Sequence, residues 1–125
     1  MSCNKPEIDF PTQAPTDLVI VDEVVGDGEE ARAGDVVDVH YVGVAFSTGE
    51  EFDASYNRGE PLRFQLGVGQ VISGWDQGVQ GMKVGGRRRL EIPTDLAYGE
   101  RGAPPVIAPG EHLILVCELV AVHRR

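Results

Sequence analysis

The chain is poor in the residues that bind metals or cross-link a fold. It has two cysteines, Cys3 and Cys117, which lie at opposite ends of its 125 residues and match no metal-binding spacing. We expect both to be free thiols in a reducing cytoplasm. Its three histidines, His40, His112 and His123, are scattered, so the sequence does not support a metal site and predicts no cofactor.

Long apolar runs and an excess of positive charge are also missing. No run approaches the length of a membrane span, and no charged-then-apolar leader opens the chain, so we expect neither a membrane segment nor a secretory signal. Twenty acidic residues against eleven basic ones give a formal net charge of −9. Such a surface repels nucleic acid and anionic membranes, so neither is predicted as a partner, and we expect a cytoplasmic monomer.

Residues 1–16 lack any periodic pattern. They hold three prolines among polar residues, which is typical of a flexible N-terminal arm. We expect this arm to be dispensable for stability and activity. The remaining residues, 17–125, are enough for one domain with its own core.

Much of the chain alternates between apolar and polar side chains, as strands do. Val37, Val39 and Tyr41 would share one face of a strand, with polar residues on the other face. Thr48-Gly49 predicts a hairpin turn. The apolar run at residues 113–122 predicts a buried final strand.

Residues 71–82, VISGWDQGVQGM, have helical periodicity instead. Ser73 is predicted as the N-cap, and Gly81 is expected near the end of the helix. Gly74 and Gly78 each cost about 1 kcal/mol relative to alanine within a helix, so this helix needs packing to hold it. Because glycine allows close approach of a backbone, we expect a sheet to press against this side of the helix.

Several strands and one good helix make the expected class α+β with an antiparallel sheet. The helix carries the only tryptophan of the chain, Trp75. Its ring could simply fill the core, or it could form the floor of a pocket. Periodicity does not separate these two interpretations.

Two catalytic or cofactor motifs are incomplete. Gly67 and Gly69 imitate a dinucleotide fingerprint, but Ile72 stands where the third glycine belongs, and no alternation of strands and helices surrounds it. The Gly-x-Ser-x-Gly elbow of serine hydrolases is missing. Neither a dinucleotide enzyme nor a serine hydrolase is therefore predicted.

The basic run at residues 87–89 divides between the two faces of a strand. Arg88 would share a face with the apolar Leu90 and Ile92. A buried guanidinium without a partner would be costly, so we expect Arg88 to meet a carboxylate or to extend its head to solvent.

Isolated apolar and aromatic residues stand beside the predicted turns, together with the polar Asp53 and Arg58. If they converge, they form an apolar pocket with a few placed hydrogen-bonding groups, the common form of a small-ligand site. The apolar members are Tyr41, Phe52, Phe64, Trp75, Tyr98 and Ile107.

Four segments resemble the FKBP family, whose members bind tacrolimus and rapamycin and catalyse peptidyl-prolyl isomerisation. They are VDVHYVG, GEEFDAS, LGVGQVISGWDQGVQGMKVGGRRRLEIP and LAYGERG. The resemblance covers residues 18–122. It implies a twisted antiparallel β-sheet wrapped around one short α-helix, with the helix tryptophan as the floor of the active-site pocket.

The resemblance also implies the residues of the site. The catalytic set would be Tyr41, Phe52, Asp53, Trp75 and Tyr98. The substrate or drug would further contact Arg58, Leu62, Phe64, Gln70, Val71, Ile72, Ile107 and Leu115.

The resemblance assigns hydrogen-bonding roles as well. The Ile72 N–H and the Tyr98 hydroxyl would hold carbonyls of the substrate or drug. Asp53 would orient and polarise the amide without transferring a proton, or it would pair with Arg58 and shape the pocket; both roles stay open.

Three positions depart from the family pattern. Leu115 replaces a phenylalanine that is frequent in the last strand, and Leu62 replaces an aromatic residue at the rim. Ala103 replaces a loop histidine found in some members. Each change removes aromatic contact from the wall, so we expect macrolide affinity to suffer more than catalysis.

The implied protein is a peptidyl-prolyl cis-trans isomerase that acts on proline-containing polypeptides without a cofactor. Macrolide inhibitors are the other expected ligands. The alternative is a binding module that docks a proline-containing partner with little turnover. A protease-coupled assay on a Leu-Pro peptide separates the two.

Overall fold

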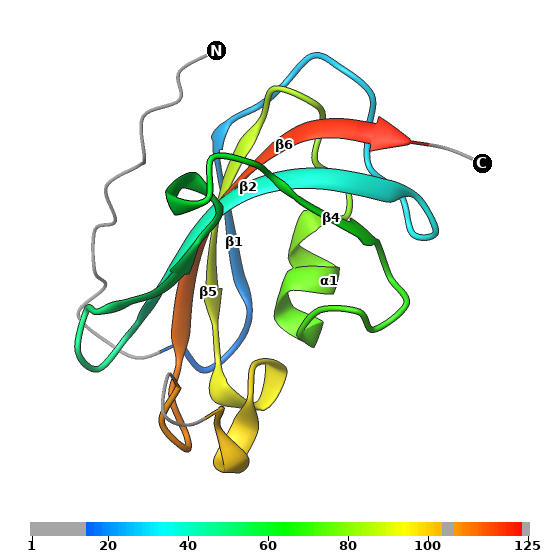
Figure 1. Ribbon diagram of the computed structural model, residues 1–125. Helices are drawn as coiled ribbons and strands as arrows, with labels where there is room; N and C mark the ends of the chain where they lie inside the picture. Colours follow the sequence, from blue (N-terminus) through cyan, green and yellow to red (C-terminus); the bar gives the residue numbers. More distant parts are fainter. Residues whose placement is uncertain (1–14, 104–106, 124–125) are drawn as a thin grey trace.

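The computed structural model describes residues 15–103 and 107–123. Within these residues, six strands form one antiparallel sheet that curves around one short helix (Figure 1). The strands and the helix are β1 (Val19–Val24), β2 (Val36–Ala45), β3 (Glu51–Ala54), β4 (Leu62–Gln65), α1 (Ser73–Val79), β5 (Arg87–Ile92) and β6 (Leu113–His123). Three short 3-10 turns are η1 (Ser55–Asn57), η2 (Thr94–Leu96) and η3 (Gly99–Arg101). The predicted α+β class and the sheet wrapped around one helix are confirmed.

The strand order is β1-β5-β6-β2-β3, and β4 also pairs with β2. Strand β2 therefore has two successive partners along its outer edge. It pairs with β4 as far as Val39 opposite Leu62, and with β3 from Val42 opposite Ala54. Tyr41 lies at the break between these partners, and this break borders the cavity described below.

The alternation in β2 places its apolar side chains in the core, as predicted. Val37 and Val39 are fully buried, and Tyr41 is 4% exposed. They belong to the main core together with Leu115 and Cys117 of β6. The hairpin predicted at Thr48-Gly49 is also present, since it joins β2 to β3 with Gly49 at a φ of 73°.

The two ends of helix α1 differ in how well the sequence predicted them. Ile72 occupies the N-cap position, and no side chain caps the helix. The predicted role of Ser73 is therefore wrong, because Ser73 already lies in the first turn. The Ile72 carbonyl instead accepts the N–H groups of Trp75 and Asp76, both at 3.0 Å. At the other end, Gly81 follows the helix with a φ of 88°, the left-handed conformation that favours glycine.

The helix glycines face strand β5, as predicted. A Cβ added at Gly74 would lie 2.5 Å from Cγ2 of Ile92, and one added at Gly78 would lie 2.6 Å from Cδ1 of Leu90. Such distances are far inside van der Waals contact. Glycine at these two positions therefore lets the helix lie directly on the sheet, which compensates for its poor intrinsic stability.

Arg88 has partners, as predicted. Its Nε lies 2.6 Å from Oδ1 of Asp22, and its Nη1 donates to the carbonyls of Gly78 and Gln80 at 3.0 and 2.8 Å. These carbonyls lie at the C-terminal end of α1, where a cation satisfies groups that have no partner within the helix. Arg88 thus joins β1 and β5 to the helix end.

The predicted arm, residues 1–16, falls mainly on residues 1–14, which lie outside the described residues, as does Cys3. The structure describes Pro15, which is buried. That the arm is dispensable stays a prediction. In the described parts of the chain, no helix has the length and apolar character needed to cross a membrane.

Candidate active site

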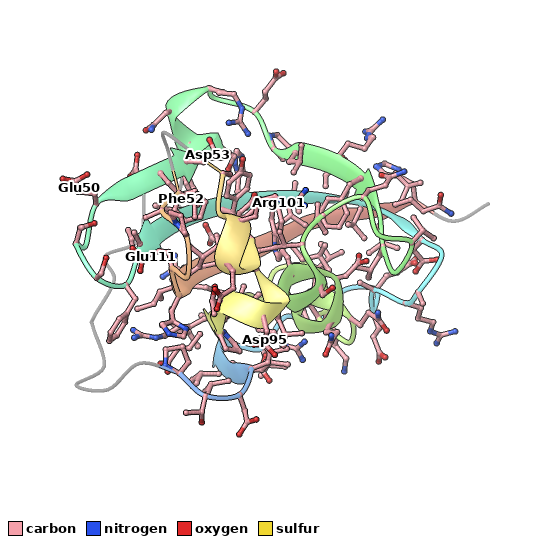
Figure 2. The ribbon with its side chains drawn as sticks, turned by 90° about the horizontal axis from the view of Figure 1, so that it is seen from below. Glu50, Phe52, Asp53, Asp95, Arg101 and Glu111 are labelled. Atoms are coloured by element: carbon pink, nitrogen blue, oxygen red, sulfur yellow. The ribbon has the colours of Figure 1, made fainter. Side chains whose placement is uncertain are left out.

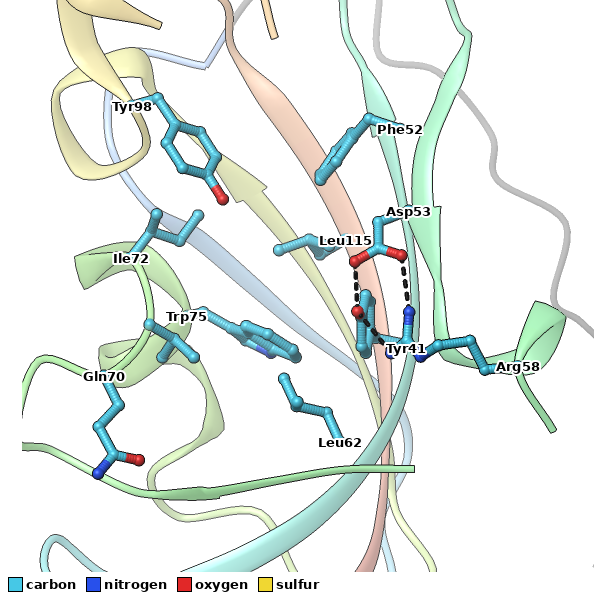
Figure 3. Close-up of a pocket in the computed structure, with 11 residues that line it drawn as sticks. Tyr41, Phe52, Asp53, Arg58, Leu62, Gln70, Ile72, Trp75, Tyr98 and Leu115 are labelled. Atoms are coloured by element: carbon cyan, nitrogen blue, oxygen red, sulfur yellow. Dashed lines mark hydrogen bonds and ion pairs between the residues drawn. The ribbon is translucent and has the colours of Figure 1, made fainter. Parts of the chain in front are cut away.

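A cavity of about 620 Å³ opens beside helix α1, within the size range of small-ligand sites. In Figure 3, Ile72 and Trp75 lie on its helix side, and Phe52 and Asp53 lie on the opposite side. The residues that line it are Tyr41, Phe52, Asp53, Arg58, Leu62, Gln70, Val71, Ile72, Trp75, Tyr98 and Leu115.

The indole of Trp75 forms the floor of this cavity and is also part of the core. It is 6% exposed, and its Nε1–H donates to Sγ of Cys117 at 2.9 Å. The ring meets Tyr41 edge-on with centroids 4.8 Å apart, and Phe64 packs against it at 5.2 Å. Both interpretations of this residue therefore hold, since one ring fills the core and presents a face to the cavity.

Three polar side chains form a closed set at one wall. The Tyr41 hydroxyl donates to Oδ2 of Asp53 at 2.5 Å, and Nη1 of Arg58 donates to Oδ1 at 2.9 Å. Nη2 of Arg58 also donates to the Tyr41 hydroxyl oxygen at 2.9 Å. Burial, reinforced by the hydrogen bond to Asp53, raises the pKa of Tyr41, so this phenol keeps its proton at neutral pH.

Tyr98 contributes a second phenol from the loop after η2. It is 40% exposed, and in Figure 3 its hydroxyl points toward the cavity. Burial and then the negative charge of Asp53 raise the pKa of Tyr98. The hydroxyl therefore stays a hydrogen-bond donor at neutral pH. Near the other rim, Oε1 of Gln70 accepts the N–H of Gln65 at 2.9 Å.

The surroundings of the cavity are acidic. A second hollow of about 360 Å³ shares Phe52 with the main cavity, and Glu50, Glu51 and Glu111 help to line it. Figure 2 shows Phe52 and Asp53 together, with Glu50 and Glu111 on the same side of the molecule. Among the described residues that line the main cavity, Arg58 is the one cation, and it is paired with Asp53, so an anionic ligand would find little compensating charge.

These groups can bind and orient a ligand, but they do not form a nucleophile with its base. The tyrosines are neutral donors, and the carboxylate accepts hydrogen bonds from two neighbours. In the part of the chain that the structure describes, no group of three or more His, Cys, Asp or Glu side chains could hold a metal ion.

A family model for FKBP-type peptidyl-prolyl cis-trans isomerases matches residues 27–120. The chain belongs to this family. It is 72% identical over 124 residues to the FK506-binding protein of Streptomyces anulatus, covering 98% of this chain and all of that protein. The peptidyl-prolyl cis-trans isomerase FPR2 of Saccharomyces cerevisiae is 57% identical over 93 residues, which cover 74% of this chain and 69% of that protein.

A solved structure of the FKBP family has the same fold. The crystal structure of AtFKBP13 superposes with a TM-score of 0.78 at 44% identity, covering 86% of this chain and 94% of that chain. The predictions of the FKBP family and of its enzyme class, peptidyl-prolyl cis-trans isomerase, are confirmed.

Two residues that the FKBP resemblance placed in contact with ligand lie behind the wall instead. Phe64 is 5% exposed and supports Trp75 from the core side. Ile107 is 2% exposed, and its backbone pairs with Ala103 through two hydrogen bonds of 2.8 and 2.9 Å. The pairing holds Ile107 in the core, so neither side chain lines the cavity.

The structure also identifies two residues of this FKBP site that the sequence did not. Cys117 supports Trp75 from β6, and Ser55 contacts the backbone of Tyr41. The partners are separated by 42 and 14 residues in the sequence. No local motif indicates either contact, because both depend on how the sheet brings its strands together.

Proposed function

We propose that this FKBP-type protein accelerates cis-trans rotation of X-Pro bonds in folding polypeptides by a non-covalent mechanism, and that its cavity binds tacrolimus and rapamycin. The observation that carries the proposal is a cavity of ligand size with largely apolar walls, an indole floor, and polar groups that are neutral or ion-paired. Such a cavity suits a proline ring, which binds by burial.

Rotation about the X-Pro amide is slow because it crosses a barrier of about 18–20 kcal/mol. Resonance makes the planar amide more polar than the twisted one. Apolar walls therefore disfavour the planar ground state relative to the twisted transition state. Each ~1.4 kcal/mol of this difference accelerates rotation tenfold. No proton has to be transferred, which fits a site whose phenols keep their protons.

The polar groups would hold the chain on either side of the proline. The ring would lie over Trp75, while the Ile72 N–H and the Tyr98 hydroxyl donate to flanking carbonyls. Asp53 is held by Tyr41 and Arg58, so it presents a fixed acceptor and a fixed charge beside the twisting amide. It would orient and polarise the amide, and the same contacts would shape the wall.

The proposed drug binding uses the same groups. The relative from Streptomyces anulatus is named for its binding of FK506, another name for tacrolimus. In this chain the indole floor and Tyr98 line one cavity with Ile72. We expect a ring of the macrolide to occupy the position of proline, and the drug to compete with peptide. A monomeric state and a cytoplasmic location stay predictions.

A protease-coupled assay on a Leu-Pro peptide, with and without tacrolimus, tests the proposal. The protein is expected to accelerate isomerisation, and tacrolimus is expected to abolish the acceleration. Tyr98→Phe, which removes a half-exposed hydroxyl, should lower turnover while leaving the melting temperature unchanged. If the peptide competes with tacrolimus but isomerises at the uncatalysed rate, the protein is a binding module and the catalytic part of the proposal fails.

Asp53→Asn separates the two roles of this carboxylate, because it keeps the size of the side chain and removes its charge. Lower turnover with unchanged tacrolimus affinity would assign Asp53 an electrostatic role in rotation. Loss of both in proportion would assign it to the shape of the wall.

A further inference from the structure

The outer edge of strand β2 has a break in its ladder of hydrogen bonds. Pairing with β4 extends to Val39 opposite Leu62, and pairing with β3 begins at Val42 opposite Ala54. Within the part of the chain that the structure describes, neither β3 nor β4 pairs with Tyr41, which lies between the two paired stretches of β2. A buried backbone N–H and carbonyl left without partners would be costly, so the break needs another group to fill it.

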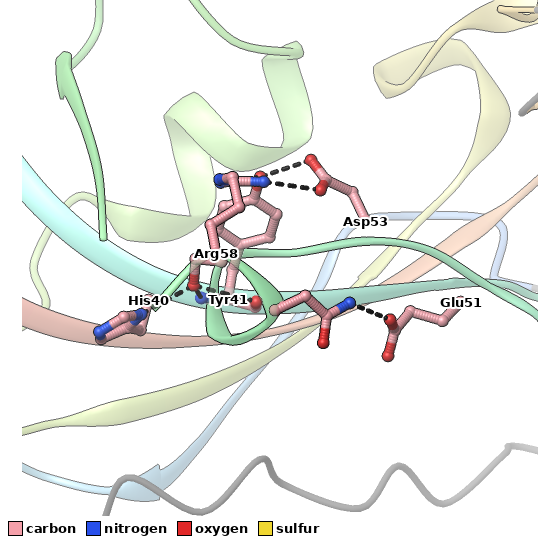
Figure 4. A network of polar contacts seen from close by, with 7 residues as sticks. His40, Tyr41, Glu51, Asp53 and Arg58 are labelled. Atoms are coloured by element: carbon pink, nitrogen blue, oxygen red, sulfur yellow. Dashed lines mark hydrogen bonds and ion pairs between the residues drawn. The ribbon is translucent and has the colours of Figure 1, made fainter. Parts of the chain in front are cut away.

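The hydroxyl of Ser55 fills this break. Figure 4 shows the polar network to which its partners His40 and Tyr41 belong. The Tyr41 N–H donates to Oγ of Ser55 at 2.7 Å, and Oγ lies 3.2 Å from the Tyr41 carbonyl, to which it can donate. Nδ1 of His40 lies 2.8 Å from Oγ of Ser55 as well. Ser55 is fully buried. Its hydroxyl therefore takes the place of the backbone groups that a neighbouring strand would present to Tyr41.

The backbone of Ser55 contacts the turn that carries Arg58, the third member of the polar set with Tyr41 and Asp53. Its carbonyl accepts the N–H groups of Arg58 and Gly59 at 3.0 and 3.1 Å and so closes the turn that carries Arg58. Asp53 lies two residues before Ser55, in β3, which ends at Ala54. The segments that carry Tyr41, Asp53 and Arg58 therefore meet at Ser55.

We propose that Ser55 is a positioning residue of the isomerase, which acts through Tyr41. The proposal rests on the function proposed above, because it assigns Ser55 to the geometry that holds Asp53 beside the amide. Without Oγ, the Tyr41 N–H loses its partner, and the β2 backbone loses its hydrogen bond to the turn that carries Arg58. The Tyr41 hydroxyl then loses its fixed distance to Asp53, although Ser55 itself touches no ligand.

The test is a double-mutant cycle of Ser55→Ala and Tyr41→Phe, measured as kcat/KM in the peptide assay. Ser55→Ala is expected to lower kcat/KM about tenfold, the size of one misplaced hydrogen bond. In the Tyr41→Phe background it should lower kcat/KM less than about twofold, because the hydroxyl that it positions is already gone. Ser47→Ala is the matched control, since Ser47 hydrogen-bonds Glu111 through both its N–H and its hydroxyl, away from Tyr41.

All variants are compared at a temperature where circular dichroism shows them folded. If Ser55→Ala does not fold, Ser55→Cys takes its place, because a thiol keeps a weaker donor and acceptor at the same position. Equal losses in both backgrounds, or no loss in the wild-type background, would overturn the positioning role. A wild-type protein without turnover would instead refute the proposed function, so the two failures are distinguishable.

Discussion

The indole N–H of Trp75 donates to the sulfur of Cys117 at 2.9 Å, so the floor of the cavity is tied to the middle strand of the sheet. Cys117 has no exposed surface and belongs to the main core. The floor therefore cannot tilt without disturbing the main core. This tie explains how a helix of seven residues can present a rigid aromatic surface.

The first prediction concerns the reactivity of this thiol. Burial raises the pKa of Cys117 to about 12, and the reactive thiolate is almost absent at mildly alkaline pH. In a Cys3→Ser variant, Ellman's reagent should react with the native protein roughly a hundredfold or more slowly than with the unfolded chain. Unfolding in guanidinium should make one thiol per chain reactive toward the reagent. Fast labelling of the native variant would show that β6 opens locally.

The second prediction concerns the contact of helix and sheet. Gly74→Ala should lower the free energy of unfolding, because the new Cβ would lie 2.5 Å from a methyl group of the buried Ile92. Overpacking costs about 1–3 kcal/mol, and the gain of about 1 kcal/mol in helix propensity offsets part of it, so we expect a net loss of up to about 2 kcal/mol. Urea denaturation measures it. Gln77→Ala, at an exposed position of the same helix, is the control and should change stability little. A stabilised Gly74→Ala would mean that the helix can move off β5.

The sequence predicted this contact because its evidence is local. Glycines at helical spacing indicate a close neighbour, and the alternation of Val37, Val39 and Tyr41 indicates which face of a strand is buried. The end of the helix at Gly81 follows from the same kind of evidence. Its beginning does not, since Ser73 is only one residue away from a position where it could cap.

The site was predicted by resemblance more than by pattern. A family motif places residues such as Trp75 and Tyr98 in a pocket, but it does not say which neighbours lie behind them. Phe64 and Ile107 have the same apolar character as the residues of the wall, so only the folded chain separates the two layers. Ser55 is an ordinary serine in the sequence, and it matters only because two strands stop beside Tyr41.

The third prediction concerns acid stability. Nε and Nη2 of Arg63 donate to the carboxylate of Asp38 at 2.7 and 3.1 Å, and His123 contacts it at 3.1 Å. The hydrogen bonds from Arg63 are the main cause of a lowered pKa of Asp38 in the folded chain. The unfolded chain therefore binds this proton at a higher pH than the folded chain does. Stability from Asp38 is fully present above its ordinary pKa and is lost as the pH falls through the lowered value.

Urea denaturation at neutral and at acid pH measures this effect. The wild type should lose more stability on acidification than Asp38→Asn, which cannot titrate at this position. Asp17→Asn, at an exposed site, is the control and should follow the wild type. Parallel curves for the wild type and Asp38→Asn would show that other groups dominate the acid response.

The fourth prediction concerns the wall of the cavity, where Leu62 and Leu115 stand at positions for which the family resemblance implies aromatic residues. Both line the cavity with Trp75, so a ring at either position would meet the same ligand surface. An aromatic contact contributes about 0.5–1.5 kcal/mol beyond the area that it buries. Tacrolimus affinity should therefore rise by roughly tenfold for each ring restored.

The double variant Leu62→Phe with Leu115→Phe tests this expectation by tacrolimus titration and by the coupled assay. Peptide turnover should change less than drug affinity, because a proline ring covers less of the wall than a macrolide does. Val68→Phe is the matched control, since Val68 is 53% exposed and does not line the cavity, so its new ring should leave tacrolimus affinity unchanged. If affinity does not rise, or if turnover rises more than affinity, the two leucines do not limit tacrolimus binding, and other residues of the cavity set its affinity.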